Sequence, residues 1–337
     1  METAVTVSRM AKVANMGTTA VRRAFLRPWQ DHGLVLGYHR VAKQWWDPWR
    51  LCVNPERFDQ QLATIARVAD FVPLSELASR LRRGRRERLA VALTFDDGYA
   101  DNLHEALPLL EKYSAPATVF VSTGWIGRAE PFWWDRLSAI LQAVERLPAE
   151  VRLQIGEDEF IHEGHPDGSG DARGKKQLLS TVRIRLMRAT EDERRAALDQ
   201  LERLADPAIR VENTARPMTP DELRRLASSP LIEIGAHTMT HCRLPDLSPE
   251  AQFEEIVGSR RQCEELVGES PSSFAYPYGD FSAATPELVR SAGFDRACST
   301  ENELLWERSD MMLVPRVFAW NHTARQFSAV MGLQRLL

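Results

Sequence analysis

The chain lacks the sequence features that mark disulfide-rich, membrane-spanning or strongly charged proteins. It has four cysteines in 337 residues, scattered without paired spacing, so we expect free thiols in a reducing compartment and no disulfide framework. No apolar run in the sequence approaches the roughly 20 residues that a membrane-spanning helix needs. The formal net charge is −4, which excludes a strong overall attraction to nucleic acid or to a membrane surface.

The N-terminal residues also lack a targeting pattern. Residues 1–19 are small and polar, without the charged and then apolar order of a secretory signal, so we expect a cytoplasmic protein. Residues 1–30 are predicted to form an N-terminal extension. Their segment 21–29 is basic and apolar, and we favour a helix packed over the domain, with weak peripheral membrane contact as the alternative.

A regular alternation of strand and helix patterns is what the chain does contain. Its composition, 44% hydrophobic and 27% charged, is typical of a soluble globular protein. Helix-start patterns with a hydroxyl residue before a proline occur at Thr219 and Ser248. The alternation predicts an α/β fold, a parallel sheet or barrel, over residues 31–337. Short apolar strand patterns lie at residues 34–39, 89–93, 117–122, 231–236, 274–276, 294–299 and 313–317.

The alternation of strand and helix patterns stops between residues 127 and 217. A helical pattern begins at residue 132, and residues 156–174 are polar and glycine-rich, which indicates a loop or a small hairpin. Residues 177–205 are predicted to be helical, with an internal helix start at Thr190. We therefore expect a mainly helical insertion that interrupts the β/α scaffold.

Two strand patterns end in chemically reactive residues. The first runs into residues 94–99 (TFDDGY), where Asp96 and Asp97 are adjacent, and the second into a glycine followed by His237 and His241. Buried carboxylates are usually paired or bound to a metal, and two histidines with one carboxylate form a common open site for a divalent catalytic metal. The spare carboxylate is then free to act as a base.

Each of these motifs taken alone has a simpler explanation. An Asp-Asp-Gly sequence is often only a turn, and a pair of histidines can be a surface feature or half of a structural zinc site. A structural zinc is disfavoured because closed zinc sites usually draw on cysteine pairs. Both motifs lie at the carboxyl ends of predicted parallel strands, where the active sites of α/β proteins gather. Their joint occurrence predicts a hydrolase with a catalytic metal.

These motifs resemble the first two signature motifs of the NodB-type polysaccharide deacetylases, carbohydrate esterase family 4. Residues 274–279 (FAYPYG) are similar to the third motif, and residues 34–41, which end in GYHRV, resemble the opening strand of one branch of the family. The resemblance covers about residues 34–317, apart from the insertion. It implies a distorted β/α barrel, the NodB homology domain, and metal-dependent removal of N-acetyl groups from amino sugars.

The resemblance also implies roles for individual residues. Asp97, His237 and His241 would bind one divalent metal ion, with zinc as the default and cobalt, nickel, manganese or iron as alternatives. Asp96 would be the base that takes a proton from water, while the metal polarises the amide. The backbone N–H of Tyr278 would help to hold the oxyanion.

The sequence departs from the family pattern in two places. The arginine that usually begins the third motif and orients the base is replaced by Phe274 or Ala275. We predict that Arg316, at the end of the last strand, supplies that charge and lies within hydrogen-bond reach of Asp96. The histidine that usually protonates the leaving amine has no close match. His322 and His39 are the candidates, with a slight preference for His322.

The residues that would contact the substrate are aromatic or lie within the motifs. Tyr99, Pro277 and Tyr278 are expected at the substrate. For Trp125 and for the adjacent pair Trp133 and Trp134, stacking on a sugar ring and packing inside the protein both remain open. The insertion is expected to form a cap beside the metal site, since loops at that end of a barrel determine substrate choice.

The leading hypothesis is a metal-dependent N-deacetylase. Its partner would be an N-acetylated sugar within a glycan precursor or glycoconjugate, and not a nucleic acid. One alternative is a hydrolase of a non-sugar amide or imide on the same scaffold. Another is an inactive carbohydrate-binding domain, which the intact Asp96 disfavours because a binding protein needs no spare carboxylate.

Overall fold

The computed structural model describes residues 32–82, 88–163, 171–206 and 215–333. The predicted N-terminal extension lies outside these ranges, so its helix and its membrane contact stay predictions. The chain divides into two compact units by its contacts. The first comprises Met1–Gln44, Arg50–Gly127 and Met218–Leu337, and the second comprises Trp45–Trp49 and Arg128–Pro217. The segment Trp45–Trp49 was not expected to join the insertion.

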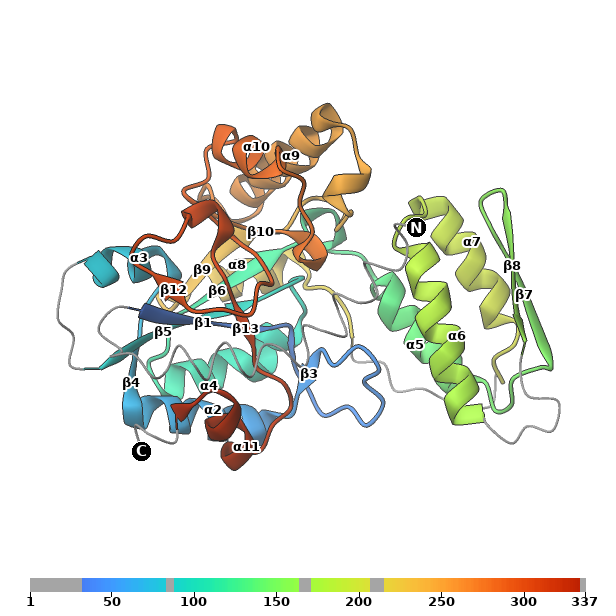
Figure 1. Cartoon of the computed structure of the whole chain (residues 1–337), viewed down its shortest axis with the longest axis horizontal. Helices are drawn as coiled ribbons and strands as arrows, with labels where there is room; N and C mark the ends of the chain where they lie inside the picture. The colour runs from blue at the N-terminus through green and yellow to red at the C-terminus, as the bar shows by residue number, and fades with distance from the viewer. Residues whose placement is uncertain (1–31, 83–87, 164–170, 207–214, 334–337) are drawn as a thin grey trace. The chain divides into compact units, whose positions relative to one another are not determined.

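The first unit is built on a nine-stranded sheet in the order β11-β10-β9-β6-β5-β1-β12, with β13 also paired to β1 and β4 to β5. All of these pairs are parallel except that of β1 with β12. The sheet curls into a half-barrel, so the predicted distorted β/α barrel is confirmed (Figure 1). The strands are β1 (His32–Tyr38), β4 (Ala69–Phe71), β5 (Leu89–Phe95), β6 (Ala117–Val121), β9 (Ile232–Ala236), β10 (Ser273–Ala275), β11 (Arg296–Cys298), β12 (Leu305–Trp306) and β13 (Val317–Phe318); the short pair β2 (Arg40–Val41) and β3 (Cys52–Val53) lies apart from the sheet.

Helices connect these strands in the alternating order that the sequence predicts. Capping boxes or single caps begin several of them: the Thr219 side chain accepts from Glu222 N–H, and the Ser248 hydroxyl accepts from Ala251 N–H. Gly268, with φ at 82°, ends the helix after Ser248. The helices of this unit are α2 (Pro55–Val68), α3 (Leu74–Arg82), α4 (Leu107–Lys112), α8 (Pro220–Ala227), α9 (Pro249–Val267), α10 (Thr285–Ser291) and α11 (Ala324–Val330).

Short helical turns complete the connections. A π-helical turn, η2 (Asn102–Ala106), leads into α4. The other turns are η3 (Thr123–Trp125), η4 (Leu244–Asp246), η5 (Pro277–Gly279) and η6 (Met311–Leu313).

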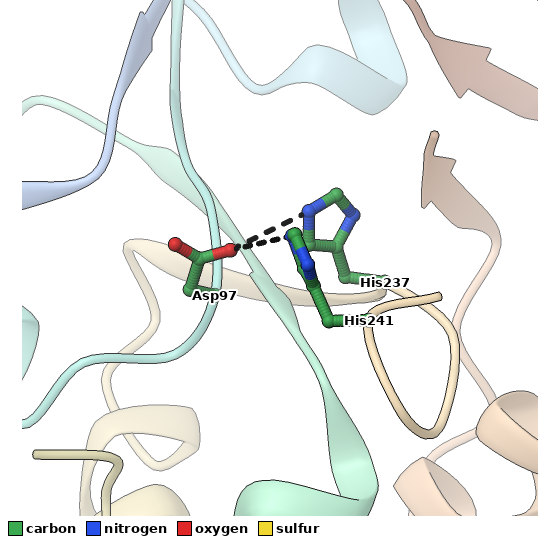
Figure 2. A group of neighbouring side chains, drawn as sticks. All are labelled: Asp97, His237 and His241. Atoms are coloured by element: carbon green, nitrogen blue, oxygen red, sulfur yellow. Dashed lines mark ion pairs between the residues drawn. The ribbon is translucent and has the colours of Figure 1, made fainter. Parts of the chain in front are cut away.

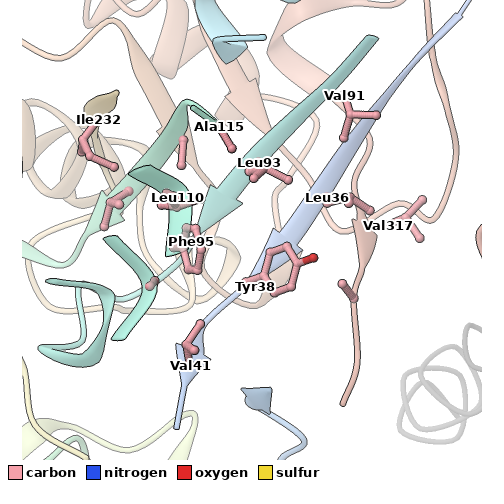
Figure 3. Close-up of a cluster of buried hydrophobic side chains, with 14 of the residues drawn as sticks. Leu36, Tyr38, Val41, Val91, Leu93, Phe95, Leu110, Ala115, Ile232 and Val317 are labelled. Atoms are coloured by element: carbon pink, nitrogen blue, oxygen red, sulfur yellow. The ribbon is translucent and has the colours of Figure 1, made fainter. Parts of the chain in front are cut away.

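The central strands β1 and β5 are buried on both faces. Leu36, Val91 and Leu93 belong to the large apolar cluster (Figure 3), whereas the alternate residues Val35 and Ala92 belong to a second cluster. Two buried faces are typical of a parallel sheet covered by helices.

The last strand differs from its prediction. Residues 313–317 were expected to form it, but the chain makes the turn η6 up to Leu313, and β13 covers only Val317–Phe318. Pro315 has no N–H to donate, so this stretch cannot continue a regular ladder. One isolated bridge joins Val314 to Cys298.

The second unit combines helices with a β-hairpin. The helices are α5 (Trp133–Ala143), α6 (Asp171–Leu186) and α7 (Glu191–Glu202), and the hairpin pairs β7 (Glu150–Ile155) with β8 (Asp158–Glu163). A capping box at Thr190 begins α7, as predicted. The hairpin begins before the expected range, and α6 begins inside it. Across both units, no described helix is long and apolar enough to cross a membrane.

Candidate active site

The ends of β5 and β9, the two strands that flank β6, bring the reactive residues together. Strand β6 pairs with β5 on one side and with β9 on the other, all in parallel, so the residues that follow β5 and β9 emerge at the same edge of the sheet. The chain turns sharply there, because Asp97, Thr238 and His241 all have positive φ, at 76°, 61° and 56°. Such conformations are uncommon for residues other than glycine and concentrate at functional sites.

The side chains of Asp97, His237 and His241 converge on one point (Figure 2). The Oδ1 atom of Asp97 lies 3.6 Å from Nε2 of His237 and 3.2 Å from Nε2 of His241. All three residues are buried, and their candidate ligand atoms lie within 4.8 Å of one another. One carboxylate and two imidazoles suit a divalent metal with open positions for water and substrate.

Two further observations fit a metal at this point. Asp97 Oδ1 is buried and makes no hydrogen bond within the described residues. Burial also raises the pKa of Asp97 despite the nearby histidines, so a cation beside it would keep the carboxylate ionised. The residues present therefore fit the group that the sequence predicts.

His237 is oriented as a metal ligand by the neighbouring strand. Its Nδ1 lies 2.7 Å from the carbonyl oxygen of Ala275 at the end of β10, and a carbonyl can only accept, so Nδ1 carries the proton. Burial lowers the pKa of His237 to about 4, which keeps the ring neutral. Its Nε2 lone pair then faces Asp97 and is available to a metal.

Asp96 and Arg316 form a buried, two-pronged ion pair. Nη1 of Arg316 lies 2.7 Å from Oδ1 of Asp96, and Nη2 lies 2.9 Å from Oδ2. Arg316 also donates to Ser299 O and to the Thr94 hydroxyl. Burial alone would raise the pKa of Asp96, but the guanidinium and the nearby histidines outweigh it and lower this pKa to about 2. The predicted contact between Arg316 and Asp96 is thus present.

The two candidate acids lie in different places. His39 Nε2 is 4.0 Å from Oδ2 of Asp96, and its ring stacks on Phe318 with centroids 5.4 Å apart. The carbonyl of His322 instead accepts from Gln61. Burial lowers the pKa of both histidines, so their pKa values do not separate them. The geometry favours His39 and reverses the preference drawn from the sequence.

Two residues expected at the substrate, Tyr99 and Pro277, are buried, and so is Trp125, for which stacking and packing were both open. Tyr99 is fully buried, with the Arg40 guanidinium 5.0 Å from its ring centroid. Pro277 is buried as well. Trp125 is 6% exposed, and its indole N–H donates to Thr240 O at 3.3 Å. These positions leave little surface for a sugar, and contact of these residues with the substrate stays a prediction.

Tyr278, from the third motif, packs against one of the candidate metal ligands. Its backbone is strained, with φ at 59°, and its ring packs edge-on against His241 with centroids 4.6 Å apart. The side chain is partly exposed. It therefore combines contact with a candidate ligand and access from solvent.

The paired tryptophans of the insertion pack inside their own unit. Trp133 and Trp134 are 5% and 6% exposed and meet edge to face, with centroids 5.4 Å apart. Trp134 stacks on Phe132 at 4.7 Å. Of the two interpretations that the sequence left open, the described contacts favour packing. Whether the insertion caps the metal site stays a prediction.

A buried pair that the sequence analysis missed ties His39 to the Asp-Asp turn. Arg40 Nε donates to Asp101 Oδ2 at 2.9 Å, and Asp101 Oδ1 accepts from Val41 N–H at 3.1 Å. Asn102 donates to the carbonyl of His39 itself. The signal was the position of these residues: Arg40 directly follows His39, and Asp101 comes four residues after Asp97.

Fold and site together are those of a β/α-barrel hydrolase with a candidate metal centre. A family model described as polysaccharide deacetylase matches residues 83–153 and 196–297, more than half of the chain. The chain belongs to the polysaccharide deacetylase family.

Curated relatives match over parts of their length. YxkH of Bacillus subtilis, named as a candidate polysaccharide deacetylase, is 20% identical over 211 residues, which is 63% of this chain and 44% of that protein. A poly-beta-1,6-N-acetyl-D-glucosamine N-deacetylase of Staphylococcus aureus is 28% identical over 111 residues, 29% of this chain and 38% of that protein. The matches thus span less than half the length of these relatives.

Solved structures share the fold. The deacetylase PplD of Streptococcus pyogenes, in complex with acetate, superposes with a TM-score of 0.56 at 18% identity, covering 89% of this chain and 98% of that one. IcaB from Ammonifex degensii gives a TM-score of 0.56 at 19% identity, covering 90% and 96%. At such identities the likeness establishes the fold alone.

Proposed function

We propose that this protein is a metal-dependent N-deacetylase that hydrolyses the acetamido group of an amino sugar. The proposal rests on one observation: a candidate metal site and a separate ionised carboxylate lie together at one edge of the sheet. Asp97, His237 and His241 form a candidate metal site, and the adjacent Asp96 is held ionised outside it by Arg316. A site that only bound sugar would not need a spare buried carboxylate.

When bound, a divalent ion supplies a Lewis acid that polarises the amide carbonyl and makes water more acidic. Asp96 accepts the proton of the attacking water. With its pKa lowered to about 2, this carboxylate is always ionised near neutral pH but is a weak base. A metal ion held by Asp97, His237 and His241 would make that water more acidic beside the carboxylate that accepts its proton.

The leaving amine needs a proton, and His39 is placed to donate it. It is the histidine next to Asp96 outside the ligand set, and Arg40, Asp101 and Asn102 fix the backbone that carries it. Tyr278 borders the site at His241. Its backbone N–H is our candidate for holding the oxyanion of the tetrahedral intermediate.

The proposed substrate is an N-acetylated sugar in a glycan precursor or glycoconjugate. Family membership and the name of the Staphylococcus aureus relative, an N-deacetylase of poly-beta-1,6-N-acetyl-D-glucosamine, support this class. We propose zinc as the default metal, because the donor set of two imidazoles and one carboxylate suits it. The cytoplasmic location stays a prediction.

Acetate release from a panel of N-acetylated monosaccharides, oligosaccharides and sugar conjugates tests the proposal. The metal-loaded protein should release acetate, and the chelated protein should not. Asp96→Asn should retain metal and lose activity by about 10²–10⁴-fold. Activity confined to non-sugar amides or imides would support the alternative hydrolase, and sugar binding without acetate release would support the inactive domain.

A further inference from the structure

The loop between the two candidate histidine ligands, residues 238–240, is held by backbone contacts on one side. The turn η3 donates two N–H groups to it: Thr123 to Thr238 O at 3.2 Å and Gly124 to Met239 O at 2.9 Å. A Cβ atom on Gly124 would lie 2.8 Å from Met239 O, so the two backbones are in close contact. With the Trp125 indole on Thr240 O, all three loop carbonyls are occupied.

On the other side the loop is held by one carboxylate. Glu255, on α9, accepts from Met239 N–H at 2.8 Å and from Thr240 N–H at 3.0 Å through the same oxygen, Oε2. Its Oε1 accepts from the Thr240 hydroxyl at 2.9 Å. Hydrogen bonds to an ionised acceptor are stronger than neutral ones, and here three of them converge on a single side chain.

The side chain of Met239 also contacts α9. A Cβ atom on Gly258, one turn further along α9, would lie 2.4 Å from Met239 Sδ. The absence of a side chain at Gly258 thus lets Met239 pack directly on the helix. The loop is bound to α9 by its N–H groups, a hydroxyl and a thioether.

This attachment matters because the loop is strained at both ends of the segment that Glu255 holds. Thr238 and His241 have φ of 61° and 56°, conformations that persist only where the surroundings determine them. If the N–H groups of Met239 and Thr240 were released, the backbone would relax towards ordinary φ. His241 Nε2 would then move from its position 3.2 Å from Asp97 Oδ1.

We propose that Glu255 is a positioning residue of the metal centre: its carboxylate fixes the loop 238–240 and thereby sets the geometry of His241 relative to Asp97 and His237. This inference rests on the proposed metal site. The hydrogen bonds of Glu255 go to the loop and to the thiol of Cys242, and within the described residues none goes to a ligand side chain. Its effect on metal affinity is therefore indirect.

The test compares metal binding by wild-type protein and Glu255→Gln. Glutamine keeps the shape but removes the charge, so the contacts with the two N–H groups and the hydroxyl become neutral hydrogen bonds, which are weaker. The dissociation constant for Zn²⁺ is measured on the apoprotein by competition with a chelator, at a temperature where the fold is intact. We expect it to weaken by about 10–100-fold. The visible spectrum of the Co²⁺ form should also change, because the ligand geometry changes.

Glu254→Gln is the matched control. Glu254 precedes Glu255 on the same helix and is exposed, so the same change there should leave the Zn²⁺ constant and the Co²⁺ spectrum as in wild type. Thr240→Val removes only the hydroxyl that donates to Oε1 and should weaken Zn²⁺ binding by a smaller factor. It decides the question alone if Glu255→Gln does not fold.

Each outcome has a definite meaning. A weaker Zn²⁺ constant in Glu255→Gln with a changed Co²⁺ spectrum supports the positioning role. An unchanged constant overturns it, even where the apoprotein unfolds at a lower temperature, because the residue then only stabilises the fold. If the wild-type apoprotein itself binds no stoichiometric Zn²⁺ or Co²⁺, the proposed metal site fails and this inference fails with it.

Discussion

Arg316 binds both carboxylate oxygens of Asp96, at 2.7 and 2.9 Å, across 220 residues of sequence. The contact is made by two pairings of β1. Strand β13 pairs with β1, with Val317 beside Leu36, and β1 pairs with β5, with Tyr38 beside Phe95. The residues that flank these strands, Arg316 and Asp96, are thereby brought together over the end of β1.

The first prediction concerns this ion pair. In Arg316→Lys a compact ammonium replaces the planar fork, so the two-pronged contact is lost. Because the paired hydrogen bonds of Arg316 help to lower the pKa of Asp96, their loss raises that pKa although the positive charge stays, and the ionised base appears only at higher pH. The acid limb of the pH profile of kcat/KM should move upward, and kcat should fall by about tenfold or more. Arg308→Lys, at an exposed position on the same unit, should change neither. An unshifted acid limb in Arg316→Lys would exclude the orienting role.

The second prediction concerns the metal. His237→Ala removes the ligand that Ala275 O orients, and the protein should lose both stoichiometric metal, measured by elemental analysis, and activity. His322→Ala should keep its metal, because its described neighbours are Gln61, Arg50 and Arg57. Retention of one metal per chain and of full turnover by His237→Ala would show that the site lies elsewhere.

A third prediction separates the two candidate acids. His39→Gln should lower kcat by about 10²–10⁴-fold and leave metal content unchanged, because His39 lies beside the base and outside the ligand set. His322→Gln should stay within about twofold of wild type. The acid limb should persist in His39→Gln, because His39 acts in its protonated form, whereas the alkaline limb should be lost. If His322→Gln shows the larger loss, the assignment from the structure is wrong.

The fourth prediction concerns the tryptophans of the insertion. Trp133→Ala should lower the free energy of unfolding by about 3–5 kcal/mol, because the ring is packed against Trp134 and leaves a cavity. Trp45→Ala, at a side chain that is 82% exposed, should leave stability within about 0.5 kcal/mol. Thermal or denaturant unfolding measures both. A raised KM in Trp133→Ala with stability unchanged would instead restore the sugar-stacking interpretation.

The site residues that could be predicted are those that short local motifs in the sequence identify. The Asp-Asp turn and the His pair each follow an apolar strand, and parallel strands place such ends together, so the sequence alone was enough to pair Asp97 with His237. The α/β fold followed from the same alternation. Arg316 was predicted because the third motif lacked its arginine and this residue was expected at the end of the last strand, whereas in the structure it directly precedes β13.

Other features depend on strand order and on packing, which local patterns do not specify. The choice between His39 and His322 required the register of β1 against β5, since that register alone places His39 beside Asp96. The inward direction of Trp125 and Tyr99 is set by their neighbours in three dimensions. Glu255 lies on a helix with several other glutamates, and nothing in its sequence context marks it as the residue that holds the histidine loop.

The insertion begins and ends at one point of the barrel. Gly127 N–H donates to Met218 O at 2.8 Å, and Met218 N–H donates to Gly98 O at 3.0 Å. The barrel residues at the two ends of the insertion are therefore hydrogen-bonded to each other, as the ends of a short turn are. During folding, β6 must find β9 across more than one hundred intervening residues, and the entropy of loop closure grows with the length of flexible chain between them. An insertion that folds by itself shortens that chain. The barrel strands then behave as if a shorter connection joined them. A chain in which a few glycines and serines replace residues 128–217 should therefore still pair β6 with β9.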